Sequence, residues 1–80
     1  MSAEEIFKTM QKLIAEQFAI DPKEITMDSS FEEDIGADSV DLVELVMAME
    51  DEFEIETEEE ELAELKTVGD CVRFLSRKLS

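Results

Sequence analysis

Apolar residues recur at three- and four-residue spacing along most of this 80-residue sequence, and this period constrains the fold more than any other feature. The signals that punctuate strands are nearly missing, because the chain has two glycines, one proline and no Asn-Gly pair, whereas helix-forming Glu, Leu, Lys, Met and Ala abound. We therefore predict an all-α fold in one domain over residues 1–80. The expected architecture is a small bundle of three longer helices plus one short helix, with a long loop between helices one and two.

The start of the first helix is marked by a capping-box pattern, in which Ser2 is followed three residues later by Glu5. The apolar spacing then predicts a helix over about Ala3–Gln17. Asp21-Pro22 interrupts this pattern, so a long loop should follow. Two apolar residues are expected to pin this loop to the core: Ile25 and Phe31.

The second helix should span about Ser39–Phe53, after Gly36 has supplied backbone freedom and with either Asp38 or Ser39 as its N-cap. Two further capping-box patterns predict the starts of a short third helix and of a last helix. These patterns are Thr57 with Glu60, before Leu62 and Leu65, and Thr67 with Asp70, before Val72 and Leu75.

The second helix carries two apolar stripes when its residues are placed at about 100° per residue. One stripe should face the core and contains Leu42, Leu45, Val46, Met49 and Phe53. Val40, Val43 and Met47 fall on or near the opposite face, among acidic residues, where a purely structural helix should be polar. Two apolar stripes on one helix predict two packing partners, of which one lies outside the bundle.

The formal net charge is −16, and no basic residue lies between Lys23 and Lys66. Such a surface repels nucleic acid phosphates and anionic membranes, so neither is an expected partner. Proteins with basic patches should instead be attracted by steering. The alternative is that these acidic side chains serve only solubility.

Several classes of function are excluded by what the sequence lacks. Without His there is no Ser-His-Asp triad and no Cys/His zinc site, and a lone Cys71 on an apolar helix face is expected to be a buried, inert thiol. An EF-hand with Gly36 at its sixth position would begin at Phe31, so that loop also fails, although crowded carboxylates favour weak divalent-cation binding. We expect no enzyme activity and no dedicated metal site. The amino terminus does not resemble a signal peptide, so a cytoplasmic protein is expected, with a removed transit peptide as the alternative.

Ser39 allows two interpretations. A serine at a helix start is commonly only a cap. A phosphodiester on the same oxygen would lie at the positive end of the helix dipole, near unpaired backbone N–H groups, so the position also suits a phosphorylated group.

The segment Asp34-Ile35-Gly36-Ala37-Asp38-Ser39-Val40 resembles the phosphopantetheine attachment motif of acyl carrier proteins. The resemblance extends along the chain, through residues 31–34 before the motif and residues 43–53 after it, and it is to the discrete bacterial-type carriers of fatty acid synthesis. It implies that Ser39 carries a 4'-phosphopantetheine arm, which a phosphopantetheinyl transferase attaches with coenzyme A as donor. Acyl groups would be held on this arm as thioesters.

The resemblance also implies two further sets of site residues. Partner enzymes would be acyltransferases, ketosynthases, reductases and dehydratases with basic patches, and the carrier would be a monomer. These enzymes would contact Asp38, Val40, Asp41, Val43, Glu44, Met47, Glu50 and Asp51. The acyl chain would be sheltered by Phe31, Val46, Met49, Leu62 and Leu65.

The sequence departs from the family pattern at two places. Val40 follows the serine where Leu is more usual, and Thr57-Glu58 replaces an aliphatic-Pro pair before the third helix, which puts the shape of the cavity there in doubt. Two alternatives to a fatty acid carrier remain open. One is an acidic helical regulatory protein in which Ser39 is only a helix cap, and the other is a carrier for polyketide or specialised lipid synthesis.

Overall fold

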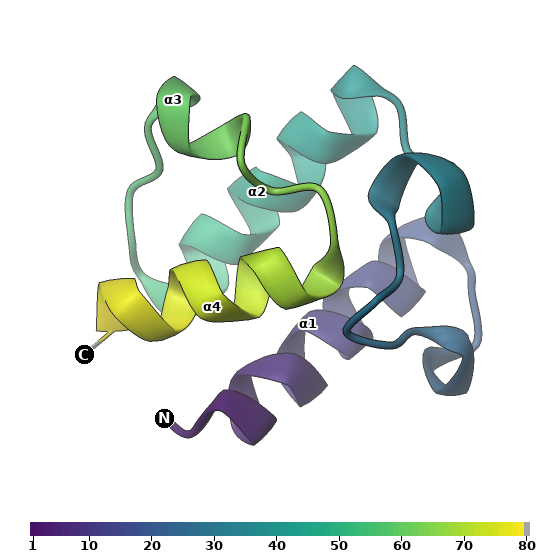
Figure 1. Ribbon diagram of the computed structural model, residues 1–80, viewed down its shortest axis with the longest axis horizontal. Coiled ribbons are helices and arrows are strands. Elements are labelled where there is room, and N and C mark those ends of the chain that lie inside the picture. The colour runs from purple at the N-terminus through teal and green to yellow at the C-terminus, as the bar shows by residue number, and fades with distance from the viewer. Residues whose placement is uncertain (80) are drawn as a thin grey trace.

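The computed structural model describes residues 1–79, in which four α-helices are joined by loops that contain two single helical turns (Figure 1). In chain order the elements are α1 (Ala3–Phe18), the 3₁₀ turn η1 (Pro22–Glu24), the π-helical turn η2 (Phe31–Ile35), α2 (Ser39–Phe53), α3 (Glu59–Leu62) and α4 (Val68–Leu79). The prediction of three longer helices and one short helix is confirmed. The loop between α1 and α2 is long, as expected, but the sequence analysis missed both turns within it.

Helix α1 lies between α2 and α4 and packs against both. Its predicted capping box is present, because Ser2 Oγ accepts the Glu5 amide at 3.2 Å and the Glu5 carboxylate accepts the Ser2 amide at the same distance. The four-residue period of its apolar side chains then faces one direction, toward the core. The fully buried core side chains are Ile6, Met10 and Ile14 from α1, Leu45 and Met49 from α2, and Val68, Val72 and Leu75 from α4.

The α1–α2 loop is held against the start of α4 by backbone hydrogen bonds. The Phe31 amide donates to the Lys66 carbonyl at 3.0 Å, and the Gly69 amide donates to the Met27 carbonyl at 2.8 Å. A Cβ at Gly69 would lie 2.9 Å from that carbonyl oxygen, so only glycine allows this approach. The side chains that were expected to pin the loop, Ile25 and Phe31, are both buried.

The two remaining capping predictions have different outcomes. Thr67 Oγ1 accepts the Asp70 amide at 3.1 Å and the Asp70 carboxylate accepts the Thr67 amide at 3.0 Å, so the box that opens α4 is confirmed. The box at Thr57 was wrong, because α3 begins one residue later with Glu58 as its N-cap. The Thr57 amide donates instead to the Glu50 carboxylate at 2.8 Å, and this bond turns the chain away from the helical path before Glu58.

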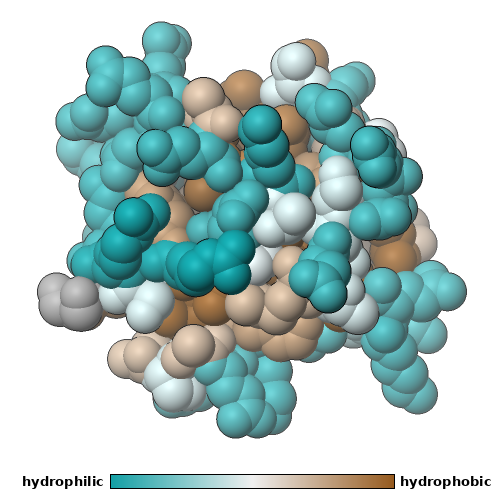
Figure 2. Space-filling model, viewed as in Figure 1, coloured by the Kyte–Doolittle hydropathy of each residue, from teal (hydrophilic) through white to brown (hydrophobic). Residues whose placement is uncertain are grey.

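Within residues 1–79, every helix is too short or too polar to meet the requirement for a membrane span. The face shown in Figure 2 is mostly hydrophilic, and hydrophilic side chains crowd over α3 in particular.

Candidate functional site

The chain enters α2 through a turn that requires glycine. Gly36 has a φ of +79°, a left-handed conformation that side chains other than glycine adopt at a cost in free energy. A Cβ there would meet no atom within 4 Å, so backbone conformation rather than space selects the glycine. The turn closes when the Ala37 amide donates to the Phe31 carbonyl at 2.7 Å, which places Ala37 in the core and leaves the next residues at the surface.

Asp38 is the N-cap of α2, and Ser39 is the first residue of the helix. The Asp38 carboxylate accepts the Asp41 amide at 2.9 Å, and the Asp41 carboxylate accepts the Asp38 amide at 3.2 Å. Ser39 is exposed, and its hydroxyl has no hydrogen-bond partner among the residues that the structure describes. The interpretation of Ser39 as only a helix cap therefore fails, because Asp38 performs the capping.

The second apolar stripe of α2 faces solvent, as the helical wheel predicted. Val40, Val43 and Met47 have exposed fractions of 65%, 50% and 59%. The acidic side chains assigned to the same face differ in their internal hydrogen bonds. Glu50 accepts the Thr57 amide, whereas the other four form no internal side-chain bond except those of the cap. The exposed or capping members are Asp38, Asp41, Glu44 and Asp51.

A groove of about 390 Å³ runs from Ser39 between α2 and the segment that contains α3. Its lining is apolar except at Ser39 and Glu59. The apolar lining residues are Leu42, Val43, Val46, Leu62, Ala63 and Leu65.

A second depression of about 460 Å³ adjoins the groove and shares Leu42, Leu62, Ala63 and Leu65 with it. Phe31 lines this second depression rather than the groove beside Ser39. The structure thus brings three of the predicted shelter residues to the groove and one to its neighbour. Met49 lines neither space and is fully buried in the core.

Sequence reasoning missed Leu42, Val43 and Ala63 as groove residues. Leu42 was assigned to the core stripe, near whose centre it lies. Val43 was assigned to the partner face, at the border nearest the core stripe, where a side chain can face a neighbouring segment as well. That border position was the available signal. Ala63 follows α3, whose position relative to α2 depends on long-range packing, so no local pattern could have found it.

Other chemistry is not assembled near Ser39. Burial of the Cys71 thiol in α4 raises its pKa to about 12, so the thiol is protonated at neutral pH. No group of three or more His, Cys, Asp or Glu side chains that could hold a metal ion occurs in residues 1–79.

The start of α2 fits a covalently attached phosphate ester. The first amide N–H groups of an α-helix have no acceptor within the helix, and the helix dipole adds partial positive charge at this end. A hydroxyl that is exposed and free of internal hydrogen bonds can be esterified without loss of a cap. The adjoining groove can take an apolar chain carried on the same arm.

These features define a carrier domain rather than a catalyst, and the comparison with known families agrees: the family model described as "Phosphopantetheine attachment site" matches residues 8–75. The chain is 49% identical over 70 residues to an acyl carrier protein of Clostridium acetobutylicum, which covers 88% of this chain and 91% of that protein. It is 41% identical over 80 residues to an acyl carrier protein of Thermosynechococcus vestitus, covering 100% of this chain and 99% of that protein.

Among solved structures, that of an acyl carrier protein from Enterococcus faecalis superimposes with a TM-score of 0.80 at 31% sequence identity, over 96% of this chain and 98% of that chain. The chain belongs to the acyl carrier protein family. As a member it carries acyl groups on covalently attached 4'-phosphopantetheine and is not itself a catalyst. Its partners are enzymes of fatty acid synthesis.

Proposed function

We propose that Ser39 carries the 4'-phosphopantetheine arm and that the protein delivers acyl thioesters to the successive enzymes of fatty acid synthesis. One observation at the start of α2 carries this proposal. Asp38 caps the helix, and the Ser39 hydroxyl is left exposed and without a hydrogen bond to the described residues. In the attachment step Ser39 Oγ forms a new bond to phosphorus of coenzyme A. The adenosine bisphosphate half of coenzyme A leaves, and a base of the transferase takes the hydroxyl proton.

The exposed stripe of α2 is the proposed docking face for these enzymes. Val40, Val43 and Met47 offer apolar contact, and Asp38, Asp41, Glu44 and Asp51 surround them with negative charge. Basic patches on the transferase and on acyltransferases, ketosynthases, reductases and dehydratases complement such a face, and steering would make their association fast and salt-sensitive. Glu50 contributes less to docking in this proposal, because its carboxylate already accepts the Thr57 amide.

The groove beside Ser39 is the proposed shelter for the acyl chain. Support comes from its apolar lining by Leu42, Val46, Leu62 and Leu65 and from its opening next to the attachment oxygen. We further propose that the protein acts as a monomer in the cytoplasm.

Intact-mass measurement tests the attachment site. Incubation with coenzyme A and a phosphopantetheinyl transferase should add the mass of one phosphopantetheine to the native protein and none to Ser39→Ala. Ser76→Ala is the matched control, since Ser76 is also an exposed helical serine and its loss should leave modification complete. Modification of Ser39→Ala, or an unmodified native chain under conditions that load another acyl carrier protein, would refute the proposal.

A further inference from the structure

The segment that forms one side of the groove is weakly held by its own sequence. Helix α3 has four residues, too few to be stable in isolation. Its glutamates repel one another, and it makes only sparse contact with the longer helices. Figure 1 shows it at the edge of the bundle between two extended connections. Two apolar anchors remain, the half-buried Leu62 and the buried Leu65, and both are also groove-lining residues.

An ion pair between Glu61 and Lys78 ties this segment to α4. Lys78 Nζ lies 3.2 Å from Glu61 Oε1, with only 35% of the Lys78 side chain and 28% of the Glu61 side chain exposed. The other lysine pair, Lys8 with Glu4 on α1, is 3.8 Å long and its side chains are 71% and 79% exposed. A pair that is partly shielded from water is less screened by salt than a fully exposed one.

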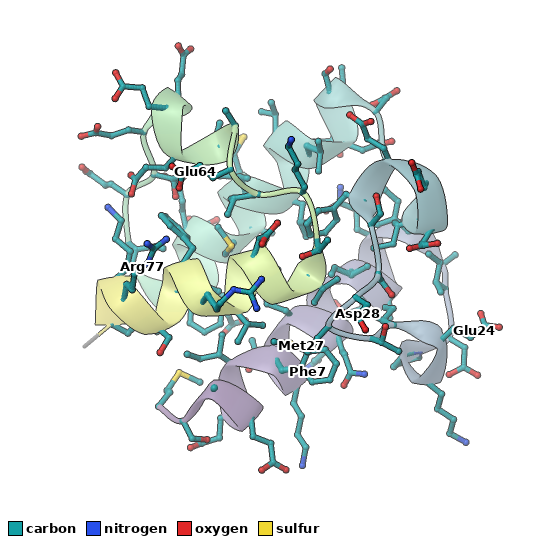
Figure 3. All side chains as sticks on the ribbon, in the orientation of Figure 1. Phe7, Glu24, Met27, Asp28, Glu64 and Arg77 are labelled. Carbon is teal, nitrogen blue, oxygen red and sulfur yellow. The ribbon has the colours of Figure 1, made fainter. Side chains whose placement is uncertain are left out.

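The surroundings direct Lys78 toward α3. Its ammonium lies over the Phe74 ring of α4, 5.5 Å from the ring centre, and this cation–π contact helps to hold the charge at the junction between α3 and α4. The amide of Glu58 is the main cause that lowers the pKa of Glu61, and Lys78 and Arg77 lower it further. The junction is a depression between α3 and α4, where Figure 3 shows Glu64 and Arg77 on facing sides.

We infer that Lys78 is a positioning residue, which holds α3 in place as one wall of the groove beside Ser39 through its ion pair with Glu61. This inference rests on the proposed function, because the position of α3 affects acyl binding only if the groove receives an acyl chain. The contact itself does not depend on the arm. Opening of the groove by movement of α3 requires that the Glu61–Lys78 pair break, so the ease of opening is set by a residue far from Ser39 in sequence.

Amide hydrogen exchange on the unmodified protein tests the inference. The hydrogen-bonded amides of Glu61, Leu62, Glu64 and Leu65 report on α3 and the turn that follows it. In Lys78→Met, which keeps a long unbranched side chain but removes the charge, these amides should exchange roughly threefold faster at low salt, as expected for loss of a partly shielded ion pair. Core amides of α1 and α2 should not change.

Salt and a second variant distinguish the pair from a general structural effect. The ratio of the α3 exchange rates in Lys78→Met to those in the native protein should approach one in about 1 M NaCl, where the Debye length is about 3 Å. Glu61→Gln should reproduce the faster exchange, and the double variant should add nothing to either single change. Lys8→Met is the matched control and should leave α3 unaffected.

Three results would overturn the inference: unchanged α3 exchange in Lys78→Met, an increase shared equally by all helices, or a ratio that salt does not alter. Because no arm is needed, the measurement stands apart from the test at Ser39. If Ser39 were not modified, the Glu61–Lys78 ion pair would have no role in acyl binding, but the hydrogen-exchange result would still stand.

Discussion

The hydroxyl group of Thr57 is expected to destabilise the folded protein. Its Oγ1 is buried and has no hydrogen-bond partner among the described residues, while its amide is satisfied by Glu50. A buried hydroxyl without a partner destabilises the folded state, and removing it with retention of shape can be favourable. We expect Thr57→Val to raise the free energy of unfolding by about 1 kcal/mol in urea denaturation.

Thr67→Val is the control, and its effect on the free energy of unfolding should have the opposite sign. Thr67 Oγ1 accepts the Asp70 amide and caps α4, so Thr67→Val should lower the free energy of unfolding by about 1 kcal/mol. Equal effects at the two threonines would show that the hydroxyl of Thr57 has a partner in solution.

Cys71 makes stability depend on alkaline pH. Burial raises its pKa from 9.0 to about 12, so the folded thiol keeps its proton at a pH where the unfolded thiol has lost it. Between pH 9 and 12 the unfolded state therefore binds fewer protons, and the free energy of unfolding falls as pH rises. Relative to Cys71→Ala, the native protein should lose about 1.4 kcal/mol for each pH unit above 9. Parallel pH profiles in urea titrations would contradict this expectation.

At the scale of a helix, capping of α2 and the proposed modification involve two different residues, Asp38 and Ser39. Asp38→Ala removes the side chain that accepts the Asp41 amide and should destabilise the protein by about 1 kcal/mol. Ser39→Ala should change stability by less than about 0.5 kcal/mol, because the Ser39 hydroxyl has no internal partner. Thermal and urea unfolding of the two variants should rank them in this order. The reverse ranking would mean that Ser39 is the cap.

The helices could be predicted because their signals are local. Apolar period and capping boxes predict both ends of α1 and α2, and the start of α4, to within about a residue. The turns η1 and η2 are too short for a period, and η2 is held by a bond from Phe31 to Lys66, far along the chain. Thr57 satisfied the local pattern of a cap, but its amide donates to Glu50, and Glu58 is the N-cap of α3 instead. Sequence reasoning failed where tertiary contacts outweighed local preference.

The same distinction between local patterns and packing applies to the candidate site. The exposed stripe of Val40, Val43 and Met47 follows from the helical wheel and is confirmed. The assignment of Ser39 as the attachment site rests on the resemblance to the family motif and stays a prediction. The groove depends on how α3 is set against α2: Met49 does not line it, and Ala63, which does, was not predicted. A pocket between two elements is a property of their packing, which no single segment encodes.

At the scale of the whole molecule, a net charge of −16 acts against compactness. The chain has 7 Lys and Arg side chains against 23 Asp and Glu side chains, so most acidic side chains lack a basic partner. Lys8, Arg73 and Lys78 each form an ion pair with one acidic side chain. Most of the negative charge is therefore balanced only by solvent ions. Unfolding increases the separation of these charges and lowers their repulsion.

Screening should consequently stabilise the fold as a whole, even while it weakens the pair between Glu61 and Lys78. The Debye length falls from about 10 Å at 0.1 M to about 3 Å at 1 M ionic strength, and each kcal/mol of repulsion removed should raise Tm by about 4–8 °C. We expect Tm to rise with NaCl, and to rise further with MgCl₂ at equal ionic strength because crowded carboxylates bind divalent cations weakly. Glu60→Gln, at an exposed position, should raise Tm at low salt and lose that advantage at 1 M NaCl. A Tm that stays constant across this range would show that repulsion contributes little, and salt would then act on α3 alone.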